Sequence, residues 1–333
     1  MKDRMKAIGR GIVRALSSVV PVVGDPKQEW IRKIAFLVAL FVFIGSAAYL
    51  IDDMVLQPRH TQVVVDTLRD LYYADSSEDD EAEDTTVYPE GMLDSFRSLY
   101  RRNADIRGWL TFATAGEDLF GGAIDNPVMQ TDNNDYYLTH DFLGDIDKAG
   151  SLYFDCRNDL SAEGVNRNLV IYGHNLKSGL MFSRFNLLSK GTLFRARQLT
   201  TLTLSTLYEQ HIYKVFAVMI VNANAEEEPV FNYIRTQFTD EEFTQFVDDV
   251  RSRSLYDFGD VDVTADDELL TLSTCSNKRE VHLSDGRTVV VARKLREGED
   301  PTVDTAKTLL NEDALMPKMW YVAKELELPE IYQ

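Results

Sequence analysis

The longest uncharged stretch of the chain runs from residue 34 to residue 51 and is mostly apolar. As a helix, it would extend about 27 Å, which is enough to cross the hydrocarbon core of a bilayer. Lysines and arginines precede the stretch, and Asp52 and Asp53 follow it. Because positive charge stays on the cytoplasmic side, the pattern predicts a single membrane span, with the N-terminus in the cytoplasm and everything after about residue 52 outside the cell.

Two other interpretations of this stretch remain open. One is a cleaved signal peptide, since Ser46-Ala47-Ala48 offers a small-residue cleavage site. However, the apolar region of a signal peptide is usually about 7–15 residues long and follows a shorter leading segment. The other is a buried core helix, but the stretch has no polar face to turn toward solvent. Its length and flanking charges therefore favour the membrane span.

From Ile106 onward the pattern changes to short apolar runs separated by turn residues. Such runs are typical of β-strands, and about eight of them with few helices between predict a mainly β fold closed into a barrel. The expected strands are residues 108–112, 127–129, 151–154, 168–174, 202–207, 211–221, 269–275 and 288–294.

Helical periodicity is confined to a few segments around these strands. We expect helices at residues 62–73, 92–102, 239–253 and 319–326. Acidic residues dominate 74–86, so that segment cannot bury a core and should form an extended spacer. The expected organisation is a tail (1–33), a membrane span (34–51), a helical and acidic stalk (52–90), an extracellular barrel (91–296) and a C-terminal helical extension (297–333).

The charge balance narrows the range of partners. The chain holds 54 acidic and 35 basic residues, for a formal net charge of −19. This balance argues against a nucleic-acid-binding protein, which needs a basic surface. No CxxC pair or His/Cys cluster indicates a structural metal site, so neither a metal nor a cofactor is expected.

Candidate chemistry lies at the ends of three expected strands. Residues 269–275 form an apolar, Thr-rich run that ends in Cys275, residues 168–174 end in His174, and Arg287 opens the strand after the cysteine. A cysteine is a good nucleophile only as a thiolate, which a neighbouring base or cation favours. If the last two strands form an antiparallel hairpin, Arg287 returns to Cys275, where a guanidinium can stabilise an oxyanion.

Competing residues are less well placed for this chemistry. Arg293 lies near the far end of the Arg287 strand, and Cys156 is interpreted as a small apolar side chain that forms no disulfide. A papain-like site is disfavoured, because it would place the cysteine on a helix and before its histidine. The other histidines flank the membrane span, sit in a polar loop, open a strand or follow the cysteine: His60, His140, His211 and His282.

Three segments resemble the signature segments of sortases, the cysteine transpeptidases of Gram-positive cell surfaces: Tyr172-Gly173-His174-Asn175, Thr271-Leu272-Ser273-Thr274-Cys275 and Arg287-Thr288-Val289-Val290-Val291-Ala292. The order of His, Cys and Arg and the N-terminal anchor match that family. Further features resemble class B in particular. These are the Thr-Leu-Ser-Thr-Cys form, Met181-Phe182, the helix at 239–253, Asp132–Leu138 and Lys148–Ser151.

The resemblance, which covers about residues 90–296, implies an eight-stranded sortase barrel and a mechanism. Cys275 would attack the Thr carbonyl of a C-terminal sorting signal, usually Asn-Pro-x-Thr in class B, and form a thioacyl enzyme. His174 would act as general acid and then base, while Arg287 would hold the oxyanion or position the signal. A cell-wall precursor amine would resolve the intermediate. The groove would be lined by Tyr172, Asn134, Leu138, Ser273, Tyr233 and Ile234.

Two alternatives to wall anchoring remain. A pilin polymerase would use the same chemistry, with a lysine of another pilin as the acceptor amine. A non-catalytic, membrane-tethered β-domain that binds cell-wall peptides would not require Cys275, His174 and Arg287 to meet in space.

Overall fold

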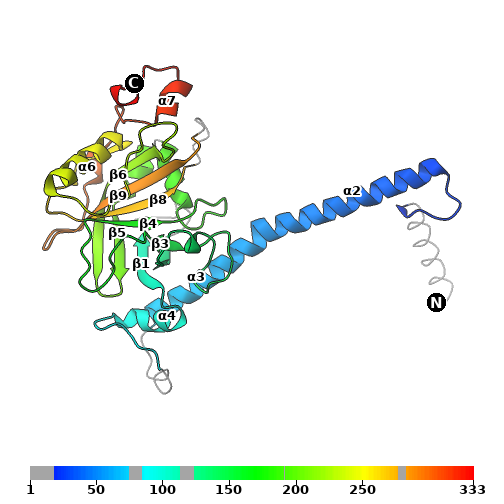
Figure 1. The fold of residues 1–333 in the computed structure, drawn as a ribbon, viewed down its shortest axis with the longest axis horizontal. Helices are drawn as coiled ribbons and strands as arrows, with labels where there is room; N and C mark the ends of the chain where they lie inside the picture. Colours follow the sequence, from blue (N-terminus) through cyan, green and yellow to red (C-terminus); the bar gives the residue numbers. More distant parts are fainter. Residues whose placement is uncertain (1–18, 75–84, 113–123, 191, 277–282) are drawn as a thin grey trace. The chain divides into compact units, whose positions relative to one another are not determined.

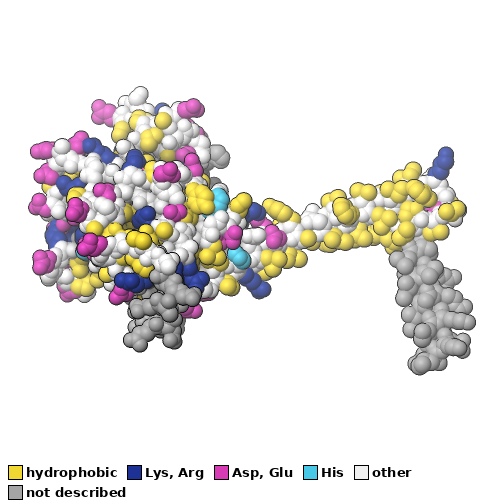
Figure 2. Space-filling view, turned by 60° about the horizontal axis from the view of Figure 1, so that its bottom comes forward, with side chains coloured by type: hydrophobic (Ala, Val, Ile, Leu, Met, Phe, Trp, Pro, Cys, Tyr) yellow, Lys and Arg dark blue, Asp and Glu magenta, His cyan; other side chains and the backbone are white. Residues whose placement is uncertain are grey.

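The computed structural model describes residues 19–74, 85–112, 124–190, 192–276 and 283–333. The chain divides into two units, Met1–Arg59 and His60–Gln333. In the first unit, the expected span lies within helix α2 (Lys27–Ile51; Figure 1), which continues through a π-helical turn, η1 (Asp52–Leu56). The continuous helical stretch Lys27–Tyr73 is long and apolar enough to cross a membrane, and its yellow apolar surface is visible in Figure 2. Much of the expected tail and acidic spacer lies outside the described residues.

Eight strands of the second unit close into a barrel in the order β1-β2-β3-β4-β8-β9-β6-β5 (Figure 1). The pairs β2·β3 and β4·β8 are parallel, and the other neighbours are antiparallel. The strands are β1 (Ile106–Phe112), β2 (Ile124–Met129), β3 (Leu152–Phe154), β4 (Asn168–Tyr172), β5 (Thr201–Thr206), β6 (Gln210–Asn222), β8 (Leu269–Cys275) and β9 (Gly286–Lys294). The mainly β barrel expected from the sequence is confirmed.

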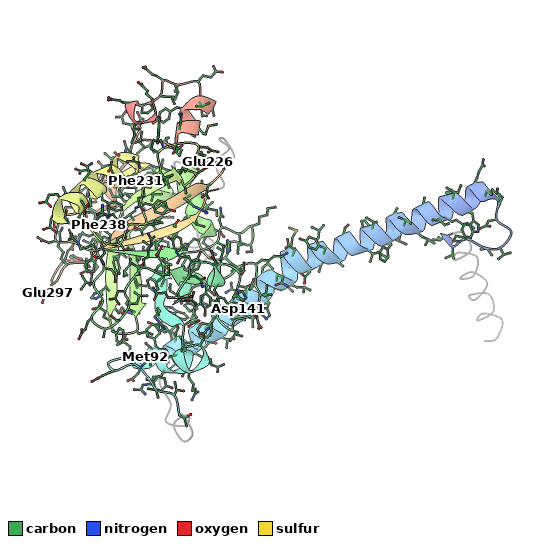
Figure 3. The ribbon with its side chains drawn as sticks, viewed as in Figure 1. Met92, Asp141, Glu226, Phe231, Phe238 and Glu297 are labelled. Atoms are coloured by element: carbon green, nitrogen blue, oxygen red, sulfur yellow. The ribbon has the colours of Figure 1, made fainter. Side chains whose placement is uncertain are left out.

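Strand β8 is buried on both faces, and its burial includes the hydroxyl side chains of Thr271, Ser273 and Thr274 as well as its three leucines. Leu270 and Leu272 belong to the barrel interior, while Leu269 belongs to a second core on the outer face. That outer core is covered by α6 (Asp240–Arg253), which Thr239 and Glu242 begin with a reciprocal capping box. The segment between β6 and α6 places Phe231 and Phe238 against Phe246 of the helix (Figure 3). Every residue of β8 is therefore buried except its last, Cys275.

A third core packs helices against β1, β2 and β3. It joins α3 (Gln57–Tyr73) and α4 (Arg97–Arg102) to the barrel. Tyr72 stacks on Trp109 with ring centroids 4.4 Å apart, and its hydroxyl donates to the Ser205 hydroxyl over 2.9 Å. An apolar aromatic pair with a satisfied hydroxyl is a stable way to seat a helix on a sheet.

Several boundaries differ from the sequence expectations. The helix expected at 92–102 begins as a 3-10 turn, η3 (Asp94–Phe96), before α4. Strand β4 ends at Tyr172, so His174 lies two residues beyond the strand. The small sheet of β7 (Tyr256–Phe258) and β10 (Thr308–Leu310) was not expected. The remaining short helices are η4 (Tyr136–Leu138), η5 (Ser183–Lys190), α5 (Leu193–Ala196), η6 (Thr305–Lys307), α7 (Lys318–Ala323) and η7 (Glu330–Tyr332).

Strand β9 is anchored at its C-terminal end by a buried ionic cluster. Glu299 accepts two hydrogen bonds of 2.6 Å from the Arg293 guanidinium and lies 2.8 Å from the Lys214 ammonium. The side chains of Arg293 and Lys214 are 1% and 6% exposed. The hydrogen bonds from Arg293 and Lys214 hold the pKa of Glu299 well below its usual range.

Replacing Glu299 by Gln should destabilise the fold by about 2–3 kcal/mol at neutral pH, because two buried cations lose their counter-charge. A carboxyl with a lowered folded-state pKa contributes stability above its unfolded value of 4.5 and loses it as the pH falls through the folded-state value. Urea unfolding should therefore show a gap between wild type and Glu299→Gln that narrows on acidification. The exposed Glu297→Gln is the control, and a gap independent of pH would contradict the assignment.

Gly173 connects β4 to His174 and is packed too tightly for any side chain. A Cβ there would lie 2.5 Å from Leu152 Cδ2 and 2.8 Å from Phe182 Cδ2. Gly173→Ala should therefore destabilise the protein by about 1–3 kcal/mol. Leu152→Val should relieve part of the clash, so the double variant should lose less stability than the sum of the two single variants in thermal unfolding. Additive losses would show that the packing around Gly173 is not the constraint.

Candidate active site

Strand pairing brings the three sequence-predicted catalytic residues to one edge of the barrel. Strand β8 runs parallel to β4 with Tyr172 opposite Ser273, and antiparallel to β9 with Cys275 opposite Arg287. The Gly173 N–H continues the first ladder by donating to the Ser273 carbonyl over 3.2 Å. His174 and Cys275 each lie two residues beyond the paired Tyr172 and Ser273, so both are positioned at the same level along the two neighbouring strands.

Cys275 is exposed, and its sulfur is held by Arg287. The Arg287 Nη1–H donates to Cys275 Sγ over 2.8 Å, while Nη2 lies 2.5 Å from Asp285 Oδ1. Burial alone would lower the pKa of Arg287, but the negative charges of Cys275 and Asp285 have the larger combined effect and raise it. A fixed cation beside a thiol favours the thiolate, which is the nucleophilic form. Asp285 leaves Nη1 oriented toward the sulfur.

His174 is half-buried and is oriented by a backbone carbonyl. Its Nε2 lies 2.7 Å from the Leu138 carbonyl oxygen. Because a carbonyl can only accept, Nε2 carries a proton, and Nδ1 is the nitrogen left for proton exchange. The neighbouring Asn175 Nδ2 donates to the Cys275 carbonyl over 2.8 Å. This side-chain bond joins the loop that carries the histidine to the end of the cysteine strand.

A buried carboxylate, Asp155, organises the polar side chains beside this edge. It accepts a bidentate pair of 2.7 Å hydrogen bonds from Arg157, one of 2.7 Å from the Tyr172 hydroxyl and one of 3.3 Å from Asn134 Nδ2. Burial alone would raise the pKa of Asp155, but the hydrogen bonds from Arg157 and Tyr172 lower it. Burial, together with the Asp155 charge, raises the pKa of Tyr172, so Tyr172 remains a hydrogen-bond donor.

The other residues predicted to line the groove lie around the same network. The Ser273 and Tyr233 hydroxyls are 3.0 Å apart and both side chains are buried. The Ile234 carbonyl accepts from Arg157 Nη2 over 3.1 Å, and the Leu138 side chain is exposed. These contacts place Ser273 and Tyr233 beneath the surface and Leu138 on it.

Sequence reasoning missed three residues of this arrangement: Asp155, Arg157 and Asn175. Asp155 and Arg157 flank Cys156 directly after β3, so an acidic and a basic residue two positions apart were an available signal. Cys156 is half-buried and has a free thiol, and its backbone N–H donates to Asn134 Oδ1 over 2.8 Å. Arg293, the competing arginine, lies at the opposite end of β9 in the Glu299 cluster.

Comparisons with known proteins agree with this geometry. The sortase domain family model matches residues 124–295. Sortase B of Listeria monocytogenes is 30% identical over 255 residues, which cover 76% of this chain and 93% of that protein.

Two solved structures are similar over most of the chain. Sortase B from Bacillus anthracis in complex with AAEK1 has a TM-score of 0.56 and 28% identity, covering 73% of this chain and 99% of that one. The Staphylococcus aureus sortase B–substrate complex has a TM-score of 0.57 and 25% identity, covering 73% and 100%. The strand order, the residues at the barrel edge and these similarities lead to one conclusion: the chain is an enzyme that belongs to the sortase family, class B.

Proposed function

We propose that this sortase cleaves a C-terminal sorting signal of the Asn-Pro-x-Thr type and transfers the carrier protein to an amine of the cell wall. The observation that supports this reaction best is the contact of the exposed Cys275 sulfur with Arg287, in register with His174. The Cys275 thiolate attacks the Thr carbonyl carbon, the peptide C–N bond breaks, and a thioester remains on the enzyme. An incoming amine then attacks the thioester and releases the thiolate.

His174 carries the proton in both halves of the reaction. The Leu138 carbonyl holds Nε2–H, so Nδ1 takes the proton that the Cys275 thiol loses, gives it to the leaving amine and later takes one from the incoming amine. A histidine that rotated freely would present either nitrogen. The backbone contact thus contributes orientation, the role that a third residue has in other nucleophile–base pairs.

Arg287 stabilises charge as it moves from sulfur to oxygen. In the resting enzyme Nη1 contacts the thiol sulfur, and in the tetrahedral intermediate the same guanidinium can donate to the oxyanion. Asp285 restrains the guanidinium, so little reorganisation is needed during the reaction. Removing one oxyanion donor typically costs about 10²–10³ in rate.

In this proposal, the C-terminal sorting signal of the substrate lies over the surface formed by Tyr172, Asn134, Leu138 and Ile234. Ser273 and Tyr233 support that surface from below through their mutual hydrogen bond. The similar Staphylococcus aureus sortase B was solved as a complex with substrate, which supports substrate binding by a barrel of this kind. The buried Asp155 fixes Tyr172 and Asn134, so the groove is set before the signal binds.

Helix α2 is, in this proposal, a membrane anchor with the N-terminus in the cytoplasm and the barrel outside. Its length and apolar surface support this assignment. A peptidoglycan precursor amine is then the nearest acceptor. A pilin lysine remains the second candidate, because the chemistry of the two acceptors is the same.

Alanine substitutions of the three candidate catalytic residues should lower activity to different extents. Cys275→Ala should abolish thioester formation with a sorting peptide. Arg287→Ala should lower kcat/KM by about 10²–10³, and His174→Ala should abolish turnover. The matched control is His140→Ala, which removes a half-buried histidine stacked on Tyr136 and should retain turnover. A covalent acyl-enzyme formed by Cys275→Ala, detected by mass spectrometry, would disprove the nucleophile assignment.

The signal and the acceptor can be assigned by one peptide panel. Fluorescent peptides with Asn-Pro-x-Thr should be cleaved faster than those with Leu-Pro-x-Thr. Added oligoglycine or a diamino-acid amine should divert the product from hydrolysis to transpeptidation, as measured by mass spectrometry. Preference for Leu-Pro-x-Thr would contradict the class B signal, and ligation only to a pilin-derived lysine peptide would favour the pilin polymerase.

A further inference from the structure

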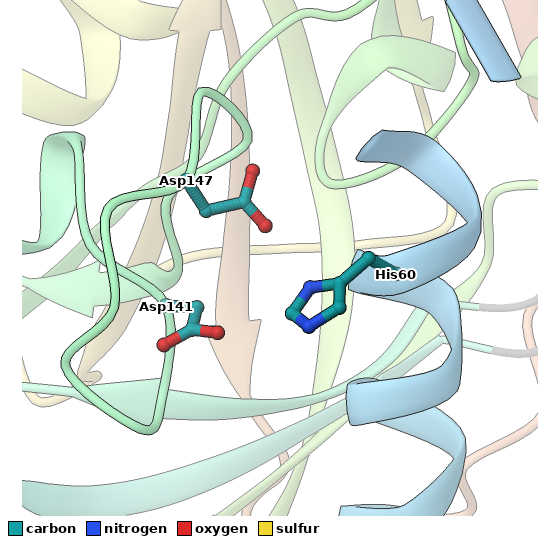
Figure 4. Close-up of side chains that lie close together, drawn as sticks. All are labelled: His60, Asp141 and Asp147. Carbon is teal, nitrogen blue, oxygen red and sulfur yellow. The ribbon is translucent and has the colours of Figure 1, made fainter. Parts of the chain in front are cut away.

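A second group of chemically active side chains lies away from Cys275, where α3 meets the loop before β3. It consists of His60 of α3 and of Asp141 and Asp147 of the loop. One ring nitrogen and one oxygen of each carboxylate all lie within 4.8 Å of one another (Figure 4). Figure 4 shows both carboxylates facing the imidazole. Helix and loop thus bring together residues that are far apart in the sequence.

Asp141 is the residue that indicates a ligand. It is 3% exposed, and its Oδ1 accepts from the Leu143 and Asp145 N–H groups over 2.9 and 3.0 Å. Its Oδ2 is buried and has no hydrogen-bond partner among the described residues. A buried carboxylate oxygen without a donor is costly, and native proteins satisfy such an atom with a proton donor or a cation.

Asp147 is fixed in a similar way. It is 4% exposed; its Oδ1 accepts from the Ala149 N–H over 2.8 Å, and its Oδ2 accepts from the Thr61 hydroxyl over 2.6 Å. Each carboxylate oxygen has a second lone pair, so these bonds orient the group without saturating it. His60 is exposed, and no hydrogen bond or ion pair to its ring occurs within the described parts of the chain. Its imidazole can therefore turn toward the carboxylates.

We propose that His60, Asp141 and Asp147 bind a divalent first-row metal ion of the Zn²⁺ or Mn²⁺ type. One imidazole nitrogen with two carboxylate oxygens suits these ions better than Ca²⁺, which prefers oxygen alone. Ligand distances of about 2.0–2.2 Å require donors to lie within about 4.4 Å of one another. A small rotation of His60 supplies that closure, and water completes the coordination on its exposed side.

The ion would link α3 to a loop that leads to the catalytic histidine. The Asp147 N–H donates to the Thr139 carbonyl over 3.0 Å, and His140 pairs with Ile146 across the loop. The residue before Thr139 is Leu138, whose carbonyl holds His174. An ion at this place would restrain the loop that orients the imidazole, without touching substrate.

The test uses the full-length chain in detergent micelles with Cys275→Ala, which removes the thiol of the barrel edge as a competing ligand. The protein is stripped with EDTA, dialysed and titrated with Co²⁺, whose visible spectrum reports the ligand type. The ligand variants are His60→Gln and Asp141→Asn. Two neighbours outside the cluster serve as matched controls, namely His140→Gln and Asp145→Asn. Circular dichroism of each metal-free variant establishes that it is folded.

The proposal predicts one equivalent of bound Co²⁺ with nitrogen and oxygen ligands, displaced by Zn²⁺. Affinity should fall at least tenfold in both ligand variants and stay unchanged in both controls. Zn²⁺ should raise the unfolding temperature of the parent protein but not of His60→Gln. Absence of stoichiometric binding, binding retained in both ligand variants, or thiolate absorption from Cys156 would overturn it. An unfolding temperature that is insensitive to EDTA and Zn²⁺ would also overturn it.

Discussion

The register of β8 between β4 and β9 is the constraint on which the candidate site depends. Cys275, His174 and Arg287 come from three separate segments, and two backbone ladders bring them to one edge. A slip of one residue would move Cys275 to the other face of the sheet. Register is protected because β8 is buried on both faces, so a slip would also exchange Leu269 and Leu270 between two different cores. The precision of the site thus derives from hydrophobic burial elsewhere in the strand.

Buried charge has different consequences at the two ends of β9. At one end, Arg293 is paired with Glu299 inside the protein and holds the strand in place. At the other end, Arg287 is paired with Asp285 yet keeps one nitrogen on an exposed sulfur. Both are arginine–carboxylate pairs, and what separates them is access to solvent and substrate. Asp155 resembles the Arg293 end of β9: its carboxylate is buried, and it holds the side chains of Tyr172 and Asn134 in place.

Sequence reasoning predicted the barrel and the segments of the site because both depend on local pattern. Eight apolar runs coincide with strands, and the motif order identified Cys275, His174 and Arg287 as candidates. It missed Asp155 and Asn175 because their importance comes from partners distant in sequence, the Tyr172 hydroxyl and the Cys275 carbonyl. It also missed β7 and β10, two three-residue strands that pair only with each other and come from segments far apart in the sequence. Local pattern identifies elements, whereas tertiary contacts decide which polar side chains meet.

Helix α3 is part of the catalytic unit rather than a spacer leading to it. Tyr72 stacks on Trp109 of β1, and Thr61 donates to Asp147 of the loop that follows Leu138. Through that loop the helix reaches the carbonyl that orients His174. A displacement of Thr61 would therefore be passed to the imidazole through Asp147, whose N–H donates to the Thr139 carbonyl next to Leu138. A substitution that loosens the packing of α3 on the barrel is therefore expected to lower the catalytic rate as well.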